Sequence, residues 1–248
     1  MSLKDKVAFI TGAGGGIGRA TALRFASEGA KIVASDIVEE SLKDVAKEIK
    51  DRGGQALASV MDHTKKDQVT DTVEKALKEF GRIDVLCNIA GINKDALCRK
   101  MSEDVFDEVI AINLKGPWLC CQSVIPAMIE QKSGAIINTS SIGAHGNLGQ
   151  TNYASAKAGV IALSKSLALE LARYNVTVNT VAPGATDTPL LRKTPQEFLD
   201  KFMAGIPLKR FATPEELASV YLFFASNEAT YITGQIIYVA GGLDMVFK

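Results

Sequence analysis

The sequence contains no long hydrophobic run and no surplus of charge of either sign. No stretch approaches the roughly 18 to 20 uncharged apolar residues that a membrane-spanning helix needs. Its 28 Lys and Arg residues balance 28 Asp and Glu residues, so no excess charge draws the chain to nucleic acid or to an anionic membrane. The opening segment, MSLKDKVAFITG, lacks the apolar core and the cleavage site of a signal peptide. We therefore expect a cytoplasmic protein that binds neither nucleic acid nor membrane.

Cysteine and histidine are also scarce. The chain has four cysteines, no two of them in CxxC spacing, and only two histidines. Zinc sites draw on clusters of these ligands at short spacings. We therefore predict no metal site, and we expect the cysteines to be reduced thiols that are mostly buried.

What the chain does contain is a regular alternation of short apolar runs with longer amphipathic stretches. Most of the runs are apolar throughout, which is typical of strands covered on both faces. Strands are expected at Val7–Thr11, Lys31–Ser35, Gln55–Val60, Ile83–Cys87, Ala135–Thr139, Val176–Val181 and Gln235–Val239. Helices are expected between them, for example over Ser41–Arg52, Lys66–Phe80, Glu103–Leu114 and Thr213–Ser226. This order predicts an α/β fold, a Rossmann-like doubly wound parallel sheet of about seven strands with helices on both faces, in a single domain of residues 1–248.

One stretch, from Pro183 to Pro207, breaks the regular alternation. It contains several prolines and charges together with apolar residues. A long irregular segment in a compact domain is often a binding loop, so we predict a substrate lid at about residues 184–207. A surface excursion with its own small core is the alternative. The apolar residues that would face the substrate are Leu190, Leu191, Phe198 and Phe202.

The first expected strand runs directly into a glycine-rich turn, TGAGGGIGR, that opens a helical stretch. Glycine lets the backbone approach a pyrophosphate closely, and the free N–H groups and dipole of the following helix favour the anion. The spacing is GxxxGxG rather than the GxGxxG of the standard dinucleotide fingerprint. Its position, where an open α/β sheet binds nucleotides, predicts a dinucleotide site. The predicted contacts are Gly12, Gly14, Gly15, Gly16, Ile17 and Gly18.

A carboxylate, Asp36, follows the second expected strand and predicts which dinucleotide binds. It can accept hydrogen bonds from both ribose hydroxyls of the adenosine half, and it repels a 2′-phosphate. Gly15 and Ile37, near which an NADP site would want a cation, are uncharged. We therefore predict a preference for NAD over NADP. Further cofactor contacts are predicted at Ile37, at Asp62 and His63 after the third strand, and at Asn88, Ala90 and Gly91 after the fourth.

A tyrosine and a lysine four residues apart, Tyr153 and Lys157, open an apolar helix. Residues at this spacing share a helix face, so the phenol and the ammonium are expected to be neighbours. A cation one turn away favours the phenolate and lowers the pKa of the phenol from about 10, which suits proton transfer at neutral pH. The preceding strand ends in Ser140-Ser141, where a hydroxyl could hold a substrate oxygen in the cofactor cleft.

Several motifs occur together in one order: TGAGGGIG, NIAG, Asn113 within AINLKG, a serine at a strand end, YASAK and Pro183-Gly184. In this combination the chain resembles the short-chain dehydrogenase/reductase family over essentially its whole length. Within that family, GINKDALCRKM and the tail from Ile206 to Gln235 most resemble the 3-oxoacyl-(acyl-carrier-protein) reductases. The resemblance implies an oxidoreductase that interconverts a secondary alcohol and a ketone with a nicotinamide cofactor.

The resemblance also implies roles for single residues. Tyr153 would be the acid/base, Lys157 its activator and a ribose ligand, and Asn113 the holder of a water in the proton relay. Thr188 falls where the family's threonine binds the nicotinamide carboxamide. Further cofactor contacts are implied at Pro183, Gly184 and Thr186.

Three departures from the family's pattern bear on these roles. The usual spacing from Tyr153 lands on Ser140, whereas alignment by the preceding strand lands on Ser141. We predict Ser141, because a strand holds its register more firmly than a loop. The family's NNAG is NIAG here. The acyl-carrier reductases usually prefer NADPH and carry a basic residue where Gly15 stands, and Asp36 runs against that habit.

The substrate is the least determined part of the prediction. The predicted contacts are Ser141, His145, Leu148, Gln150 and, from the lid, Leu190. These walls are largely apolar, so we expect an acyl chain or an alicyclic or steroid-like body, although His145 could equally be a plain loop histidine. A 3-oxoacyl thioester on acyl carrier protein or CoA is the first candidate. The alternatives are a hydroxysteroid or alicyclic alcohol dehydrogenase and, in another class, a non-catalytic dinucleotide sensor.

Protein partners are predicted from the resemblance alone. Lys132 and Arg173 stand near where the resembling reductases dock their acidic carrier protein, although two solvated surface cations are the simpler explanation. The family also implies a homotetramer. The apolar segment Tyr231–Met245 is the expected interface.

Overall fold

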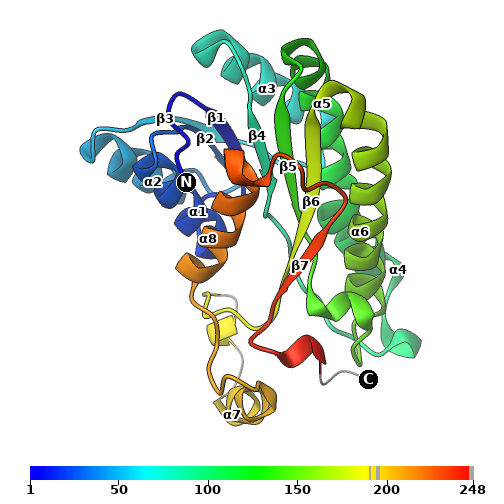
Figure 1. Cartoon of the computed structure of the whole chain (residues 1–248). Helices are drawn as coiled ribbons and strands as arrows, with labels where there is room; N and C mark the ends of the chain where they lie inside the picture. The colour runs from blue at the N-terminus through cyan, green and yellow to red at the C-terminus, as the bar shows by residue number, and fades with distance from the viewer. Residues whose placement is uncertain (190, 194–195, 246–248) are drawn as a thin grey trace.

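Seven parallel strands form the centre of the molecule. The computed structural model describes residues 1–189, 191–193 and 196–245. The strands are β1 (Val7–Thr11), β2 (Lys31–Asp36), β3 (Gln55–Val60), β4 (Val85–Asn88), β5 (Gly134–Thr139), β6 (Val176–Pro183) and β7 (Ile236–Val239). Their order in the sheet is β3-β2-β1-β4-β5-β6-β7 (Figure 1). The predicted doubly wound α/β fold is therefore confirmed, and each predicted strand agrees with the observed one to within two residues at either end.

Helices cover both faces of this sheet. They are α1 (Gly16–Ser27), α2 (Glu39–Asp51), α3 (Lys66–Phe80), α4 (Glu103–Ile110), α5 (Gly116–Gln131), α6 (Thr151–Leu171), α7 (Gln196–Gly205) and α8 (Pro214–Ala225). Helices α1, α2 and α8 lie on one face, and α3, α5 and α6 lie on the other (Figure 1). The start of α8 shows how local sequence sets a boundary: Thr213 and Glu216 form a reciprocal capping box, with Pro214 in the first turn.

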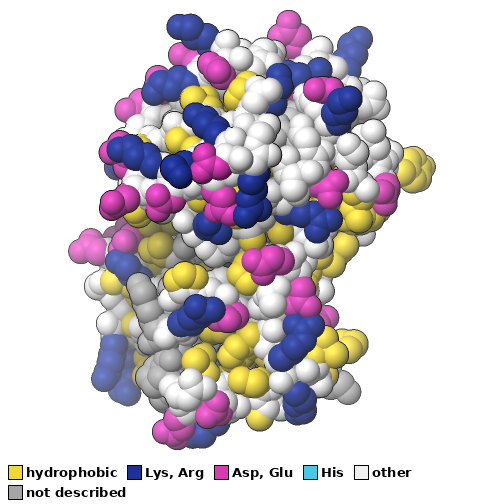
Figure 2. All heavy atoms as spheres, turned by 90° about the vertical axis from the view of Figure 1, so that its left-hand side faces the viewer, with side chains coloured by type: hydrophobic (Ala, Val, Ile, Leu, Met, Phe, Trp, Pro, Cys, Tyr) yellow, Lys and Arg dark blue, Asp and Glu magenta, His cyan; other side chains and the backbone are white. Residues whose placement is uncertain are grey.

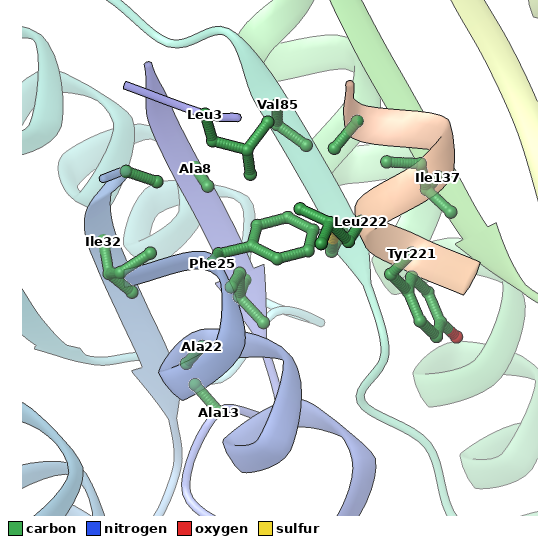
Figure 3. Packing of buried hydrophobic residues seen from close by; sticks show 14 of the residues in the cluster. Leu3, Ala8, Ala13, Ala22, Phe25, Ile32, Val85, Ile137, Tyr221 and Leu222 are labelled. Atoms are coloured by element: carbon green, nitrogen blue, oxygen red, sulfur yellow. The ribbon is translucent and has the colours of Figure 1, made fainter. Parts of the chain in front are cut away.

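Successive residues of a central strand point into opposite layers, and both layers bury them. Ala8 and Ile10 of β1 pack with α1, α2 and α8, whereas Val7 and Phe9 pack with α3, α5 and α6. Figure 3 shows the first of these clusters, in which Phe25 of α1 points toward the α8 side of the core. This two-sided burial explains why the strands read as continuous apolar runs rather than as alternating patterns.

The segment predicted as an irregular lid contains regular structure. A short 3-10 turn spans Leu191–Lys193 and helix α7 follows, projecting beyond the end of the sheet (Figure 1). The prediction of an irregular chain was therefore wrong here. The apolar residues within α7 do have helical spacing, but the prolines on either side of the helix made the whole segment look irregular. Leu190 lies outside the described residues, as does the side chain of Phe198.

The surface offers no large patch of one charge on the face seen in Figure 2, where basic and acidic side chains are interspersed. Among the residues that the structure describes, no helix is both long enough and apolar enough to cross a membrane. Within the same residues, no group of three or more His, Cys, Asp and Glu side chains could hold a metal ion.

Candidate active site

A cavity of about 1070 Å³ opens at the carboxyl ends of the central strands. Residues that follow β1, β2, β4, β5 and β6 line it, together with the start of α6 and the segment that carries α7. The chain adds β2 and β3 on one side of β1, and β4 to β7 on its other side. The cavity therefore lies at the point where the strand order reverses, which is where open α/β sheets bind nucleotides.

The glycine turn forms one wall of this cavity. Helix α1 begins at Gly16, directly after Gly15 in extended conformation. A Cβ on Gly18 would lie 2.0 Å from the carbonyl oxygen of Gly12, so only glycine allows the helix to pack this closely on the turn. Gly12 itself has φ +69°, which disfavours other residues. The free N–H groups at the start of α1 can therefore face an anion in the cavity.

Asp36 lies against the same turn. Its Oδ2 accepts a hydrogen bond from the Gly14 backbone N–H at 3.1 Å, and its Oδ1 accepts one from Val38 at 3.2 Å. Asp36 and Ile37 both line the cavity, whereas Gly14 does not. The predicted contact of Gly14 with the cofactor stays a prediction. Gly14 leaves room for the carboxylate, because a Cβ there would approach Asp36 Oδ2 to 2.9 Å.

Asp62 and His63, after β3, line the cavity next to this end. The His63 side chain is buried, and its Nε2 lies 2.9 Å from the backbone oxygen of Ile112. Burial lowers the pKa of His63, so its neutral form is favoured. The imidazole is thus packed against the turn that precedes α5 as well as against the cavity.

Asn88 was predicted to contact the cofactor, which stays a prediction; the structure shows its side chain in the core. Its side-chain amide donates to Asn138 Oδ1 at 2.8 Å and to the Pro117 backbone oxygen at 3.3 Å, inside the core. It does not border the cavity, whereas Ala90 and Gly91 do. The last residue of a buried strand faces whichever layer the alternation dictates, and for Asn88 that is the α5 layer.

Two hydroxyls at the cavity are buried and have no hydrogen-bond partner among the described residues. They belong to Ser35, at the end of β2, and Thr186, after β6. Buried polar atoms are almost always paired in native proteins, so these two suit a polar ligand. Together with the glycine turn they fit a bound dinucleotide. The other cavity residues on the β6 side are Pro183, Gly184, Ala185, Thr188 and Pro189.

Tyr153 faces the cavity from the first turn of α6, and Ser141 lies beside it: a Cβ on Gly143 would lie 3.3 Å from Tyr153 Cε1 and 3.4 Å from Ser141 Oγ. Ser140 borders the cavity as well, but its hydroxyl donates to the Lys157 backbone oxygen at 2.8 Å. Ser141 accepts an N–H from Gly143 at 3.0 Å, which leaves its own proton free to donate. Of the two candidates, only Ser141 has its hydroxyl next to the phenol.

The Lys157 ammonium is buried beside Tyr153, 5.7 Å from the centre of the phenol ring. It donates to the Thr139 backbone oxygen at 2.9 Å. Burial lowers the pKa of Lys157 to about 8, so the ammonium persists at pH 7 and is lost as the pH rises through that value.

The prediction that Lys157 lowers the pKa of the phenol stays a prediction. Burial raises the pKa of Tyr153, the neighbouring Ser141 hydroxyl opposes that rise, and the carboxylate of Asp95 adds to it. The ammonium of Lys157 lies beside the phenol ring and donates to the Thr139 carbonyl.

Thr139 also connects the two faces of the sheet. While its carbonyl holds Lys157 of α6, its hydroxyl lies 2.6 Å from the Tyr221 hydroxyl of α8. Both contacts are buried. One residue at the end of β5 therefore touches the active-site lysine on one side and the opposite helical layer on the other.

Asn113 sits in a π-helical turn, Ala111–Lys115, between α4 and α5. Its side chain exchanges two hydrogen bonds with the backbone of Ile92, accepting at 2.9 Å and donating at 2.8 Å. A Cβ on Gly91 would lie 2.8 Å from Asn113 Oδ1 and 3.5 Å from Lys157 Nζ. The turn thus places Asn113 next to the Gly91 backbone, which Lys157 also approaches. Single π turns of this kind often mark functional sites.

The predicted substrate contacts divide in two. Gln150 is buried and borders the cavity. His145 stacks on Tyr238 with ring centres 5.3 Å apart, and Leu148 is 85% exposed; neither borders the cavity. Both lie in the 3-10 turn and loop before α6, and both are exposed there. Cavity residues that the sequence analysis missed are Thr11, Ser35, Met61, Ile89, Ile92, Asn93, Asp95, Ile112, Thr139, Ile142, Gly143, Gly146, Asn147, Ala185 and Leu199.

The role of the two surface cations, Lys132 and Arg173, in docking a carrier protein stays a prediction. Lys132 and Arg173 precede the amino ends of β5 and β6, and the cavity opens at the carboxyl ends. Arg173 rests on the Tyr174 ring, 4.7 Å from its centre. Neither cation borders the cavity of its own chain.

Comparison with known proteins identifies the family. A family model described as Enoyl-(Acyl carrier protein) reductase matches residues 12–244. The 3-oxoacyl-(acyl-carrier-protein) reductase FabG of Thermotoga maritima is 49% identical over 244 residues, which cover 98% of this chain and 99% of that protein. The chain belongs to the short-chain dehydrogenase/reductase family.

Other members of the short-chain dehydrogenase/reductase family differ in what their names say they act on. The FabG of Chlamydia muridarum is 43% identical, over 97% of this chain and 98% of that protein. A solved levodione reductase has a TM-score of 0.95 and 35% identity, covering 98% of this chain and 99% of its own. The chain is therefore an oxidoreductase that acts on CH–OH groups with a nicotinamide dinucleotide.

Proposed function

We propose that this enzyme is an NAD(H)-dependent reductase of 3-oxoacyl thioesters, which interconverts the 3-ketone and the secondary alcohol. The observation that carries the proposal is that Tyr153 and the buried ammonium of Lys157 line one cavity, with Ser141 next to Tyr153 and between the lining residues Ser140 and Ile142. The two matching FabG proteins, named as 3-oxoacyl reductases, support the choice of substrate. An intact pair of this kind argues against the non-catalytic dinucleotide sensor.

In the proposed mechanism, Ser141 and Tyr153 both donate hydrogen bonds to the substrate carbonyl oxygen. A bound nicotinamide supplies the hydride to the carbonyl carbon. As negative charge develops on the oxygen, Tyr153 transfers its proton there and Ser141 stabilises the remaining charge. Lys157, still an ammonium at pH 7, stabilises the phenolate that Tyr153 becomes. Asn113 contributes by holding the backbone next to Lys157.

The preference for NAD over NADP is also proposed, on the position of Asp36. Its carboxylate lines the cavity next to the glycine turn, and Gly15 and Ile37 add no cation there. A second negative group, such as a 2′-phosphate, would be repelled at this place.

The remaining parts of the proposal concern the assembly. We propose that the thioester is carried on acyl carrier protein or CoA, that the segment at about 184–207 acts as a substrate lid, and that the protein is a cytoplasmic homotetramer. Leu191, Leu199 and Phe202 line the cavity from the lid segment, which supports its role next to an acyl chain. Tyr231 is fully exposed, as expected of an apolar interface on the isolated chain.

A second candidate is a dehydrogenase of alicyclic or steroid-like alcohols. The likeness to levodione reductase favours it, as does the apolar wall of the lid segment. A substrate panel separates the two. Acetoacetyl-CoA, a cyclic ketone and a steroid ketone are compared with NADH and with NADPH, followed by nicotinamide absorbance. We expect acetoacetyl-CoA with NADH to give the highest kcat/KM. A higher kcat/KM for the cyclic or steroid ketone would favour the second candidate instead.

The choice between the two serines gives a separate prediction. Ser141→Ala should lower kcat by about 10²-fold or more, because it removes a hydroxyl that stabilises the developing charge. Ser140→Ala should keep most of the activity, because that hydroxyl is bonded to the Lys157 backbone. Steady-state kinetics of the two variants provide the measurement, each serving as the other's control. The opposite ranking would assign the role to Ser140.

A further inference from the structure

One wall of the substrate side of the cavity is polar. Gln150 is buried there, and its side-chain Nε2 donates to Asp95 Oδ2 at 3.2 Å. Its Oε1 accepts from Asn147 Nδ2 at 3.2 Å. Asp95, Asn147 and Gln150 all line the cavity, so two loops that are far apart in sequence contribute one continuous polar surface.

This wall adjoins the reacting hydroxyls. A Cβ placed on Gly143 would lie 3.3 Å from Tyr153 Cε1, 3.4 Å from Ser141 Oγ and 3.4 Å from Gln150 Oε1. The three groups therefore converge around a single backbone position. Asp95 is one hydrogen bond further along, so a group attached next to the ketone would lie near its carboxylate.

The charge of Asp95 is not balanced by an ion pair among the described residues. The cation next to it in sequence, Lys94, is paired with Glu108 of α4. The hydrogen bond that Asp95 accepts comes from the neutral amide of Gln150. Its field also reaches the phenol, because the Asp95 carboxylate raises the pKa of Tyr153. An anion entering this side of the cavity would meet that field.

We propose that Asp95 makes this enzyme select 3-oxo compounds whose carboxyl group is masked as an ester or thioester over free 3-oxo acids. The inference rests on the proposed function. A free acid would place a second carboxylate next to Asp95, whereas a thioester places no charge there. Two unit charges on the order of 7 Å apart, at an effective dielectric constant of about 40, shift an equilibrium by about sevenfold.

The test compares methyl acetoacetate with acetoacetate in the native enzyme and in Asp95→Asn. Asparagine keeps an oxygen that accepts from Gln150, so the wall retains its geometry while the charge is lost. We expect the preference for the ester, measured as the ratio of the two kcat/KM values, to fall by about five- to tenfold. Asp104→Asn is the matched control: it removes an exposed carboxylate of α4 that does not border the cavity, and the ratio should stay unchanged.

Ionic strength provides a readout that a purely structural role would not alter. Raising the salt concentration screens exposed charges, so it should reduce the native preference and leave that of Asp95→Asn nearly constant. Turnover of both compounds with the same ratio in the native and variant enzymes would overturn this inference and leave the proposed function standing. Failure of the native enzyme to turn over acetoacetyl-CoA as well as these two 3-oxo compounds would overturn both.

Discussion

Replacing Tyr153 by Phe should lower kcat by about 10²- to 10⁴-fold, because the substitution removes the proton donor and leaves the ring in place. Binding of the nicotinamide cofactor should change little, since the phenol oxygen is one group among many along the cavity. The measurement combines steady-state kinetics with cofactor titration by fluorescence.

Tyr174→Phe is the matched control for this loss. Tyr174 lies in the 3-10 turn before β6 and does not line the cavity, so removing its hydroxyl leaves the reactive groups in place. A Tyr153→Phe enzyme that keeps its kcat to within tenfold would contradict the proposed proton transfer. The cavity would then still be a nucleotide site, but the chemistry would need another donor.

The second large effect is expected in cofactor choice. Asp36→Ala combined with Ile37→Arg should raise the ratio of kcat/KM for NADPH to that for NADH by about a hundredfold or more. A unit charge about 5 Å from a dianionic phosphate, at an effective dielectric constant of about 40, changes the binding free energy by about 3 kcal/mol. Both substitutions act in the same direction, because one removes a negative charge and the other adds a positive one.

A control variant with the same change of net charge, made at neighbouring residues outside the cavity, tests whether the effect depends on position or on net charge alone. Glu39→Ala combined with Val38→Arg alters two exposed residues that do not line the cavity. Its cofactor ratio should stay within about threefold of the native value, because exposed charges are screened. A native enzyme that already prefers NADPH would show that the Asp36 carboxylate does not govern the choice.

The sheet was predictable because each of its strands carries a local signal. Val7–Thr11 is buried on both faces and therefore reads as an unbroken apolar run, and the glycine turn after it follows from steric contacts within a few residues. Tyr153 and Lys157 could be paired because helical spacing alone places them on one face.

The parts that escaped prediction depend on contacts distant in sequence or on a shift of a single residue. The helix expected over Glu103–Leu114 ends at Ile110, where a π turn begins. A π turn holds one more residue than an α-helical turn, and the hydrophobic pattern of the sequence does not reveal it. Asp95 was missed because its place in the cavity depends on Gln150, 55 positions away. The choice of Ser141 over Ser140 stays a prediction, which the contact of Ser141 with Tyr153 supports.

Thr139 has a consequence for engineering this enzyme. Because its hydroxyl contacts Tyr221 and its carbonyl holds Lys157, helix α8 is mechanically linked to the reactive centre through the thickness of the sheet. We therefore expect substitutions on α8 that displace Tyr221 to change the rate as well as the thermal stability, so both should be scored in a screen.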